Sequence, residues 1–274
     1  MSTSSYTVKR SCLHNIRVTS SVRDSTADIP EGIILPPAMM AMMDFAPYEQ
    51  VVLTKVGGDN WMNRMSTFIL PGDNEEVEVR GSVAHLLEVG DVCCLIARTT
   101  LNQEQYESHI AGRFEPALID ARFYPETEVL NDYSKAKIVL ENRHQHRQVD
   151  SVSDDVLARR LELPRILLSN LLAGLEIQEV ERRGCIEMSA ELPIDYMRRA
   201  GFCSNQSILV YNASRGAASA ESYVVPSLTK KTVGISGALS AVADVGDRVS
   251  EAAFIGTTDQ RKPTICNLLK EPIL

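Results

Sequence analysis

Short apolar runs alternate with clusters of turn-forming residues along most of the chain. The runs are rich in valine, isoleucine and threonine and often alternate apolar with polar positions, a pattern that favours strands over helices. Turn-forming pairs separate them, as in GGDN at Gly57 to Asn60 and PGDN at Pro71 to Asn74. The runs expected to be strands are Tyr6 to Thr19, VVLTKV, MSTFIL, VEVR and DVCCLIA. The pattern therefore predicts a mainly β protein.

Three segments carry helical signals instead. PAMMAMM, Pro37 to Met43, begins with proline, which is tolerated in the first turn of a helix. PIDYMRRAG, Pro193 to Gly201, ends on a glycine that can form the C-cap. A third helix is expected from the acidic start at Asp154 up to Pro164.

One stretch of sequence occurs twice. VEVRGSVAHLLEVGD, Val77 to Asp91, returns as VGISGALSAVADVGD, Val233 to Asp247, with valine, glycine and aspartate at matching places. A repeat of this length predicts two similar units. Short strands with few helices favour a small closed or nearly closed barrel in each. We expect a first barrel at 1–130, a linker and helix at 131–160, and a second barrel at 161–274.

Composition narrows the class of protein. The net charge of −8 repels phosphate backbones, so no nucleic-acid partner is expected. No apolar run approaches the roughly 20 residues of a membrane helix, and no signal-peptide core is evident, so we expect a cytoplasmic protein without membrane contact. The six cysteines contain no C-x-x-C pair and should be reduced. The RHQH cluster, Arg143 to His146, lacks a third ligand in spacing, so no metal is expected.

Ordered landmarks carry a family resemblance. They are SCLHNIRVT, the pair Asp24-Ser25, RMSTF, VRGSVAH and VGD in the first unit and, more weakly, RRGC, VYNASRG, SYVV and ISGALSA in the second. In order and spacing the chain resembles the pyruvoyl-dependent aspartate 1-decarboxylases. The resemblance implies two tandem double-psi β-barrel-like units with short helices. Because that family forms tetramers with sites at subunit interfaces, the resemblance also implies a homodimer similar to that tetramer.

The resemblance implies reactive chemistry at Ser25. Its hydroxyl would attack the carbonyl of Asp24, cut the chain there and leave a pyruvoyl group as the cofactor. The ketone of that group forms a Schiff base with a small amino-acid substrate and accepts the electrons released when carbon dioxide departs. The expected activity is decarboxylation of aspartate or a close analogue to a β-amino acid for biosynthesis. The counterpart in the second unit is Cys185, whose thiol either makes the same acyl shift or is a small core residue.

The same resemblance assigns four further residues. Arg64 matches the arginine that holds the substrate carboxylate, and Thr67 matches the threonine that orients the serine carbonyl. Gly81 and Ser82 match the small residues that line the site. Each has an ordinary alternative: a surface ion pair for Arg64, a plain strand residue for Thr67, and a close approach of two strands at Gly81.

Other positions depart from the family pattern. Cys12 replaces a lysine two residues before the matched His14, Phe68 replaces the tyrosine that supplies a proton, and Arg80 replaces an asparagine. The second unit retains the tyrosine, as Tyr223. Arg80 is either a second cation for a more anionic substrate or part of a surface ion pair.

Each unit lacks some of the family's reactive residues, and some of those missing from one unit are present in the other. If sites form between units, Ser25 and Arg64 of one would meet Tyr223 of the other, and one type of working site would remain. Two functional classes follow from the sequence. One is a self-processing pyruvoyl decarboxylase. The other is an uncleaved duplicated barrel that acts as a binding or regulatory protein, or as an enzyme of a different reaction type.

Overall fold

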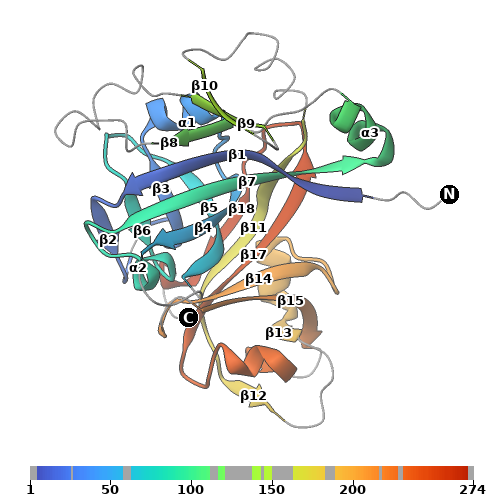
Figure 1. Ribbon diagram of the computed structural model, residues 1–274. Coiled ribbons are helices and arrows are strands. Elements are labelled where there is room, and N and C mark those ends of the chain that lie inside the picture. Colours follow the sequence, from blue (N-terminus) through green and yellow to red (C-terminus); the bar gives the residue numbers. More distant parts are fainter. Residues whose placement is uncertain are drawn as a thin grey trace.

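The computed structural model describes residues 5–25, 27–57, 63–111, 117–120, 138–142, 145–149, 163–182, 189–215, 218–227 and 231–270. Figure 1 shows a first half, blue to green, and a second half, yellow to red, each built around a β-sheet. Short helices connect some of the strands. The predicted class, mainly β with two barrel-like units, is confirmed.

The first half forms a ten-stranded sheet in the order β10-β9-β8-β1-β7-β4-β5-β3-β6-β2. Its strands are β1 (Ser5–Arg17), β2 (Ser20–Val22), β3 (Gly32–Leu35), β4 (Gln50–Val56), β5 (Arg64–Pro71), β6 (Glu78–Arg80), β7 (Val92–Asn102), β8 (Ala117–Asp120), β9 (Ile138–Asn142) and β10 (Gln145–Val149). β3 runs parallel to β5 and antiparallel to β6, so the sheet is not a simple meander. β9 and β10 lie in the range expected to be a linker.

The second half forms an eight-stranded sheet in the order β12-β16-β13-β15-β14-β17-β11-β18. Its strands are β11 (Arg165–Glu176), β12 (Glu179–Glu181), β13 (Ser189–Pro193), β14 (Ser207–Asn212), β15 (Ala218–Ser227), β16 (Gly234–Ser236), β17 (Arg248–Thr257) and β18 (Thr264–Asn267). Read from β18 to β12, this order repeats the order from β8 to β2 strand for strand. The two halves therefore share one topology.

The short helices also correspond between the halves. α1 (Pro37–Met43) and α5 (Ile194–Ala200) follow β3 and β13, as the sequence predicts, and each ends on a left-handed residue, Asp44 or Gly201. α2 (Val83–Leu86) and the 3-10 helix η3 (Gly237–Ala241) follow β6 and β16. α3 (Gln103–Ala111) follows β7, and η4 (Leu268–Lys270) follows β18. The helix expected to begin at Asp154 lies outside the described residues.

Strand register is repeated as closely as strand order. β1 pairs with β7 and β11 pairs with β17 across two irregularities each, at Lys9/Ser11 and Leu13/Ile16 in β1 and at Leu168/Asn170 and Leu172/Leu175 in β11. Inside the second irregularity, Asn15 and Gly174 both adopt positive φ, 58° and 78°. The register therefore gives a residue-by-residue equivalence between the halves. Their origin by tandem duplication stays a prediction.

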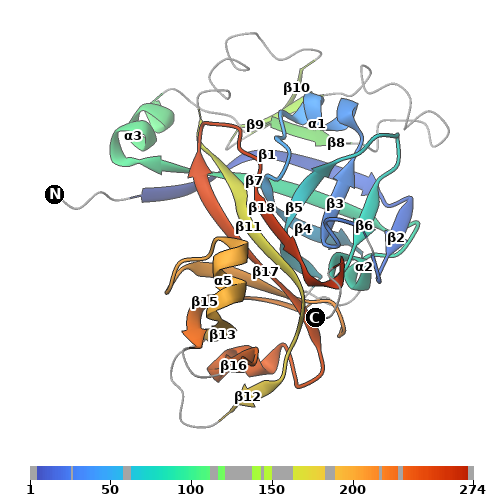
Figure 2. The same cartoon turned by 180° about the vertical axis from the view of Figure 1, so that it is seen from behind.

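The two halves share an apolar core. Side chains of the first half pack in one cluster with six buried residues of the second, Leu168, Leu171, Ala173, Leu209, Tyr211 and Ala252. Figure 2 shows β11 passing along the strands of the first half, where it contacts β4 and β7. A separate cluster fills the second half. Among the described residues, no helix is long and apolar enough to cross a membrane.

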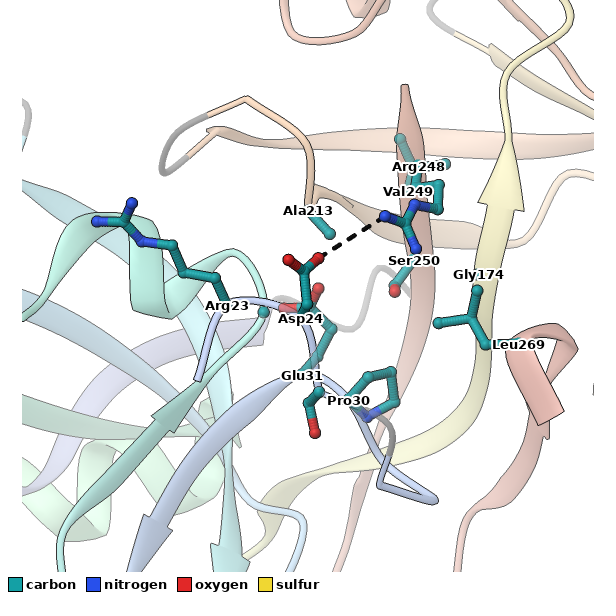
Figure 3. A pocket seen from close by; sticks show the side chains of 12 residues that line it. Arg23, Asp24, Pro30, Glu31, Gly174, Ala213, Arg248, Val249, Ser250 and Leu269 are labelled. Carbon is teal, nitrogen blue, oxygen red and sulfur yellow. Dashed lines mark ion pairs between the residues drawn. The ribbon is translucent and has the colours of Figure 1, made fainter. Parts of the chain in front are cut away.

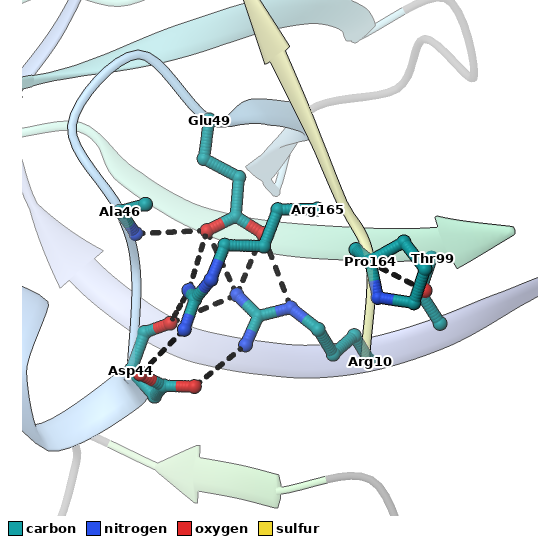
Figure 4. Close-up of polar contacts among 7 residues, drawn as sticks. All are labelled: Arg10, Asp44, Ala46, Glu49, Thr99, Pro164 and Arg165. Atoms are coloured by element: carbon teal, nitrogen blue, oxygen red, sulfur yellow. Dashed lines mark hydrogen bonds and ion pairs between the residues drawn. The ribbon is translucent and has the colours of Figure 1, made fainter. Parts of the chain in front are cut away.

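A buried charge network joins the start of the second half to the first (Figure 4). Arg10, fully buried in β1, donates from Nε and Nη2 to Glu49, with Nη2 2.6 Å from Oε1 and 2.8 Å from Oε2. Its Nη1 lies 3.1 Å from Asp44 Oδ2. Arg165 of β11 donates to the same two acids, at 2.7 Å to Asp44 and 3.3 Å to Glu49. Two buried cations and two carboxylates thus neutralise one another across the boundary.

Candidate active site

A pocket of about 260 Å³ lies between the two halves. Drug-sized ligands occupy roughly 300–1,000 Å³, so this volume suits a smaller molecule such as an amino acid. Figure 3 shows Asp24 and Glu31 of the first half facing Arg248 and Ser250 of β17. The lining residues are Arg23, Asp24, Ser25, Pro30, Glu31 and Gly81 from the first half, and Gly174, Ala213, Arg248, Val249, Ser250 and Leu269 from the second.

Ser25 lies in the loop between β2 and β3, which forms one wall of the pocket. It is only 8% exposed, and its Oγ accepts the amide N–H of Ala27 at 3.2 Å, a local turn that fixes the hydroxyl. The preceding Asp24 has a side chain that is 86% exposed. The peptide bond between these residues therefore runs from the solvent edge of the pocket to its interior.

Glu31 is the most unusual ionisable group of the pocket. It is buried, and its Oε2 accepts the amide N–H of Ser82 at 3.0 Å and the Ser82 hydroxyl at 2.7 Å. Burial raises the pKa of Glu31 to about 7, although the two bonds from Ser82 act in the opposite direction. The carboxyl therefore exchanges its proton near neutral pH.

Gly81 makes room for that carboxyl. It has a left-handed φ of 60°, and a Cβ at this position would lie 2.4 Å from Glu31 Oε1. A side chain here would be strained and would also displace the carboxylate. The glycine that begins the Gly81-Ser82 turn is thus required by the buried acid beside it.

Two buried hydroxyls near this boundary are unsatisfied. Among the described residues, neither Thr67 Oγ1 nor the Tyr211 hydroxyl has a hydrogen-bond partner. The ring of Tyr211, from β14, packs edge-on against Phe68 of β5 with centroids 6.4 Å apart. Burial, and secondarily the charge of Glu31, raises the pKa of Tyr211 well above its ordinary value. The second half thus places a neutral phenol beside the ring of Phe68.

Arg248 supplies positive charge at the pocket mouth. Its side chain is 52% exposed, and its Nη2 lies 3.7 Å from Asp24 Oδ1, beyond hydrogen-bonding distance. Such an exposed pair contributes little stability. The other arginine of the lining, Arg23, is already engaged at 2.9 Å by Glu88. Arg248 is therefore the cation best placed to exchange its partner for a ligand carboxylate.

Comparison with known proteins adds a family to this geometry. A sequence model described as aspartate decarboxylase matches residues 5–117. An aspartate 1-decarboxylase of Haloquadratum walsbyi is 31% identical over 88 residues, which cover 32% of this chain and 71% of that protein. The chain belongs to the aspartate decarboxylase family. Membership supports a decarboxylase-like function with a small-molecule substrate and rests on the first half, which contains the family match.

The residues that the aspartate decarboxylase resemblance assigns are not all brought together. Gly81 lines the pocket with Ser25, and Ser82 holds Glu31. Arg64, exposed at the start of β5, and Thr67, buried in the same strand, are not part of the described lining. Their predicted roles stay predictions.

Arg80 and Tyr223 are also absent from the described pocket lining. Arg80 forms a partly buried ion pair with Glu78 and donates to the carbonyl of Ile29 at 3.4 Å. Tyr223 is 54% exposed on β15. Cys185 lies outside the described residues.

Sequence reasoning missed another serine of this aspartate decarboxylase homologue. Ser189 begins β13 and pairs with Tyr223 of the parallel β15, while its hydroxyl lies 2.7 Å from that of Ser236 in β16. In the first half the equivalent register positions are glycine at Gly32 and phenylalanine at Phe68. In the sequence, Ser189 is visible as a serine at the start of an alternating run. Its position beside Tyr223 depends on the pairing of β13 with β15, which residue spacing does not predict.

Proposed function

We propose that this family member is a self-processing, pyruvoyl-dependent α-decarboxylase of aspartate or a close analogue, and that Ser25 provides the pyruvoyl group. The product would be a β-amino acid for biosynthesis. The observation that carries the proposal is the position of Ser25, buried in a pocket of amino-acid size between two barrel-like units. A buried acid and an exposed arginine line the same pocket.

The surroundings of Ser25 fit a small ketone group. The Ser25 side chain is shielded from solvent and lies in a pocket of about 260 Å³. A pyruvoyl group would supply the ketone that captures a substrate amine and the electron sink for decarboxylation. Low water content around that carbonyl would favour condensation with an amine over hydration.

Arg248 and Glu31 take the roles of orientation and proton transfer. Cleavage after Asp24 would leave that residue joined to the chain only through Arg23, so that its side chain could move aside and the Arg248 guanidinium could hold a substrate carboxylate. Both Ser82 donors bind Oε2 of Glu31, so Oε1 is the oxygen available to carry a proton. With a pKa of about 7, Glu31 carries that proton near neutral pH and can deliver it to the carbon that loses carbon dioxide.

One observation favours the second functional class. Arg64 and Tyr223, which the resemblance assigns to substrate binding and proton transfer, are absent from the described lining of the Ser25 pocket. An uncleaved chain would retain Asp24 beside Arg248 and would use the pocket to bind a small zwitterion. Processing of the purified protein separates the two classes.

Intact-mass analysis is the first test. Under the proposal, the purified chain yields a fragment that ends at Asp24 and a larger fragment that begins at position 25 with a blocked N-terminus. Ser25→Ala should abolish cleavage, because no hydroxyl remains to attack the Asp24 carbonyl. Ser250→Ala is the matched control, since Ser250 lines the same pocket from the opposite wall and should leave cleavage intact.

Two other outcomes have defined meanings. A single full-length species after prolonged incubation would contradict self-processing. A cut before Ser189 instead would move the reactive site to the second half, beside Tyr223.

Glu31 should control the pH dependence of turnover. The decarboxylation rate of the processed enzyme is expected to fall as pH rises above about 7, because Glu31 then loses its proton. Glu31→Gln should lower the rate roughly 100-fold, as expected for loss of a positioned acid. Ser82→Ala should move the fall in rate to higher pH, because the Ser82 hydroxyl lowers the pKa of Glu31. A profile that Ser82→Ala leaves unchanged would exclude Glu31 as the titrating group.

A further inference from the structure

A thiol, an imidazole and a second thiol lie in contact on the paired strands β1 and β7 of the first sheet. His14 Nδ1 is 3.0 Å from Cys94 Sγ, and His14 Nε2 is 3.1 Å from Cys12 Sγ. Cys12 is buried, whereas His14 and Cys94 are partly exposed. Both ring nitrogens therefore have a sulfur partner, and the sulfur nearer to solvent is that of Cys94.

The matching strand register of the two halves relates this cluster to the Ser25 pocket. Leu13 pairs with Leu95, and their equivalents Leu172 and Glu251 pair in the second half. Cys94 precedes Leu95 and Ser250 precedes Glu251, so Cys94 is the equivalent of Ser250, which lines the Ser25 pocket. One member of the cluster, Cys94, thus occupies in the first half a strand position that forms part of the pocket wall in the second.

The neighbouring residues follow the same equivalence. Cys12 and His14 correspond to Leu171 and Ala173 of β11, which carry no polar side-chain atoms. Asn15 corresponds to Gly174, another residue of the pocket wall. At the positions of Cys12 and His14, the first half therefore has reactive side chains where the second has apolar ones.

We propose that Cys94 is a nucleophilic thiol, with His14 as its base and Cys12 as the group that orients the imidazole, in a site for small soft carbon electrophiles. A nucleophile beside a base that a third group holds in place is the general arrangement of covalent catalysis. The tautomer required has Nε2–H donating to Cys12 Sγ, which leaves Nδ1 to accept the proton of Cys94. The inference is independent of processing at Ser25.

The chemical step balances without a further reactant. With iodoacetamide as the electrophile, the Cys94 proton moves to His14 Nδ1, the sulfur forms a bond to the methylene carbon, and the carbon–iodine bond breaks to release iodide. His14 then returns its proton to water. Cys93, the next residue, provides an internal contrast, because burial raises its thiol pKa far above the ordinary value.

Timed alkylation of the full-length chain with iodoacetamide, followed by peptide mass mapping, tests the proposal. Cys203 is the matched control, because it is an exposed free thiol without a histidine contact among the described residues. At pH 7, Cys94 is expected to react roughly tenfold faster than Cys203, although it is less exposed. The advantage should persist at pH 6 and shrink at pH 9, where ordinary thiols ionise.

Variants separate activation from exposure. His14→Gln should remove the advantage of Cys94 and leave the Cys203 rate unchanged, while continued protection of the buried Cys93 reports an intact fold. Cys12→Ser retains an acceptor for Nε2–H and should keep most of the rate, whereas Cys12→Ala should lower it several-fold. Equal or slower reaction of Cys94 than of Cys203 in the unmodified chain would overturn the proposal, as would a His14→Gln variant with unchanged Cys94 reactivity.

Discussion

Replacing Arg10 with methionine is expected to lower the free energy of unfolding by about 3–5 kcal/mol, the typical loss when one partner of a buried ion pair is removed. Arg10 is fully buried and makes three of the contacts to Glu49, with Nη2 as close as 2.6 Å. Without it, the buried carboxylate of Glu49 retains Arg165 at 3.3 Å and the amide N–H of Ala46 at 2.9 Å. Urea denaturation followed by circular dichroism measures the change.

A double variant separates the charge effect from loss of packing. Arg10→Met combined with Glu49→Leu removes both members of the pair, and buried ion pairs exchanged for apolar residues of similar size often retain stability. We expect the double variant to recover most of the loss. A loss below about 1 kcal/mol in the single variant would mean that the network contributes no more than a surface pair.

Local signals made much of the secondary structure predictable. Proline at the start of α1 and glycine after α5 mark helix ends through backbone geometry that does not depend on distant residues, and both predicted helices were confirmed. The mainly β class followed from alternation in the same way. The correspondence of strand order between the halves could not be read locally, because it depends on which strands pair.

The residues of the candidate site likewise divide into those that local sequence patterns predict and those that they do not. Ser25 and Gly81 were assigned from ordered landmarks, and they line one pocket. Glu31 and Arg248 were not singled out, because an acid in a loop and an arginine at the start of a strand are ordinary until burial and contact are known. The contact of His14 with Cys94 likewise requires the pairing of β1 with β7. Local sequence patterns therefore do not identify side chains whose role depends on contacts with residues far along the chain.

Glu251 is a further buried acid, and removing it should stabilise the protein. It lies in β17 between Leu172 and Val210, and neither of its oxygens has a hydrogen-bond partner among the described residues. The first half has Leu95 at the equivalent position, between Leu13 and Leu53. The second half thus buries an unpaired carboxyl where the same fold elsewhere accommodates leucine.

The effect of Glu251 on stability depends on pH in a defined direction. Burial raises its pKa from 4.5 to about 8, so the folded chain binds more protons than the unfolded chain between these values. Stability therefore falls as pH rises through this window and is constant above it. At pH 8, Glu251→Leu is expected to raise the free energy of unfolding by roughly 2–5 kcal/mol, after allowance for relaxation around the charge.

Glu251→Gln distinguishes the charge from the packing. Glutamine cannot ionise, so its advantage over glutamate should be present at pH 8 and vanish below about pH 4, where glutamate is neutral in both states. Leucine should retain part of its advantage at the lower pH, because it also removes a buried polar group without partners. Glu31, whose pKa is also raised, to about 7, is common to all three chains and cancels in the comparison. Denaturation curves at the two pH values measure both differences, and a glutamine variant with the same advantage at each pH would show that the charge of Glu251 does not limit stability.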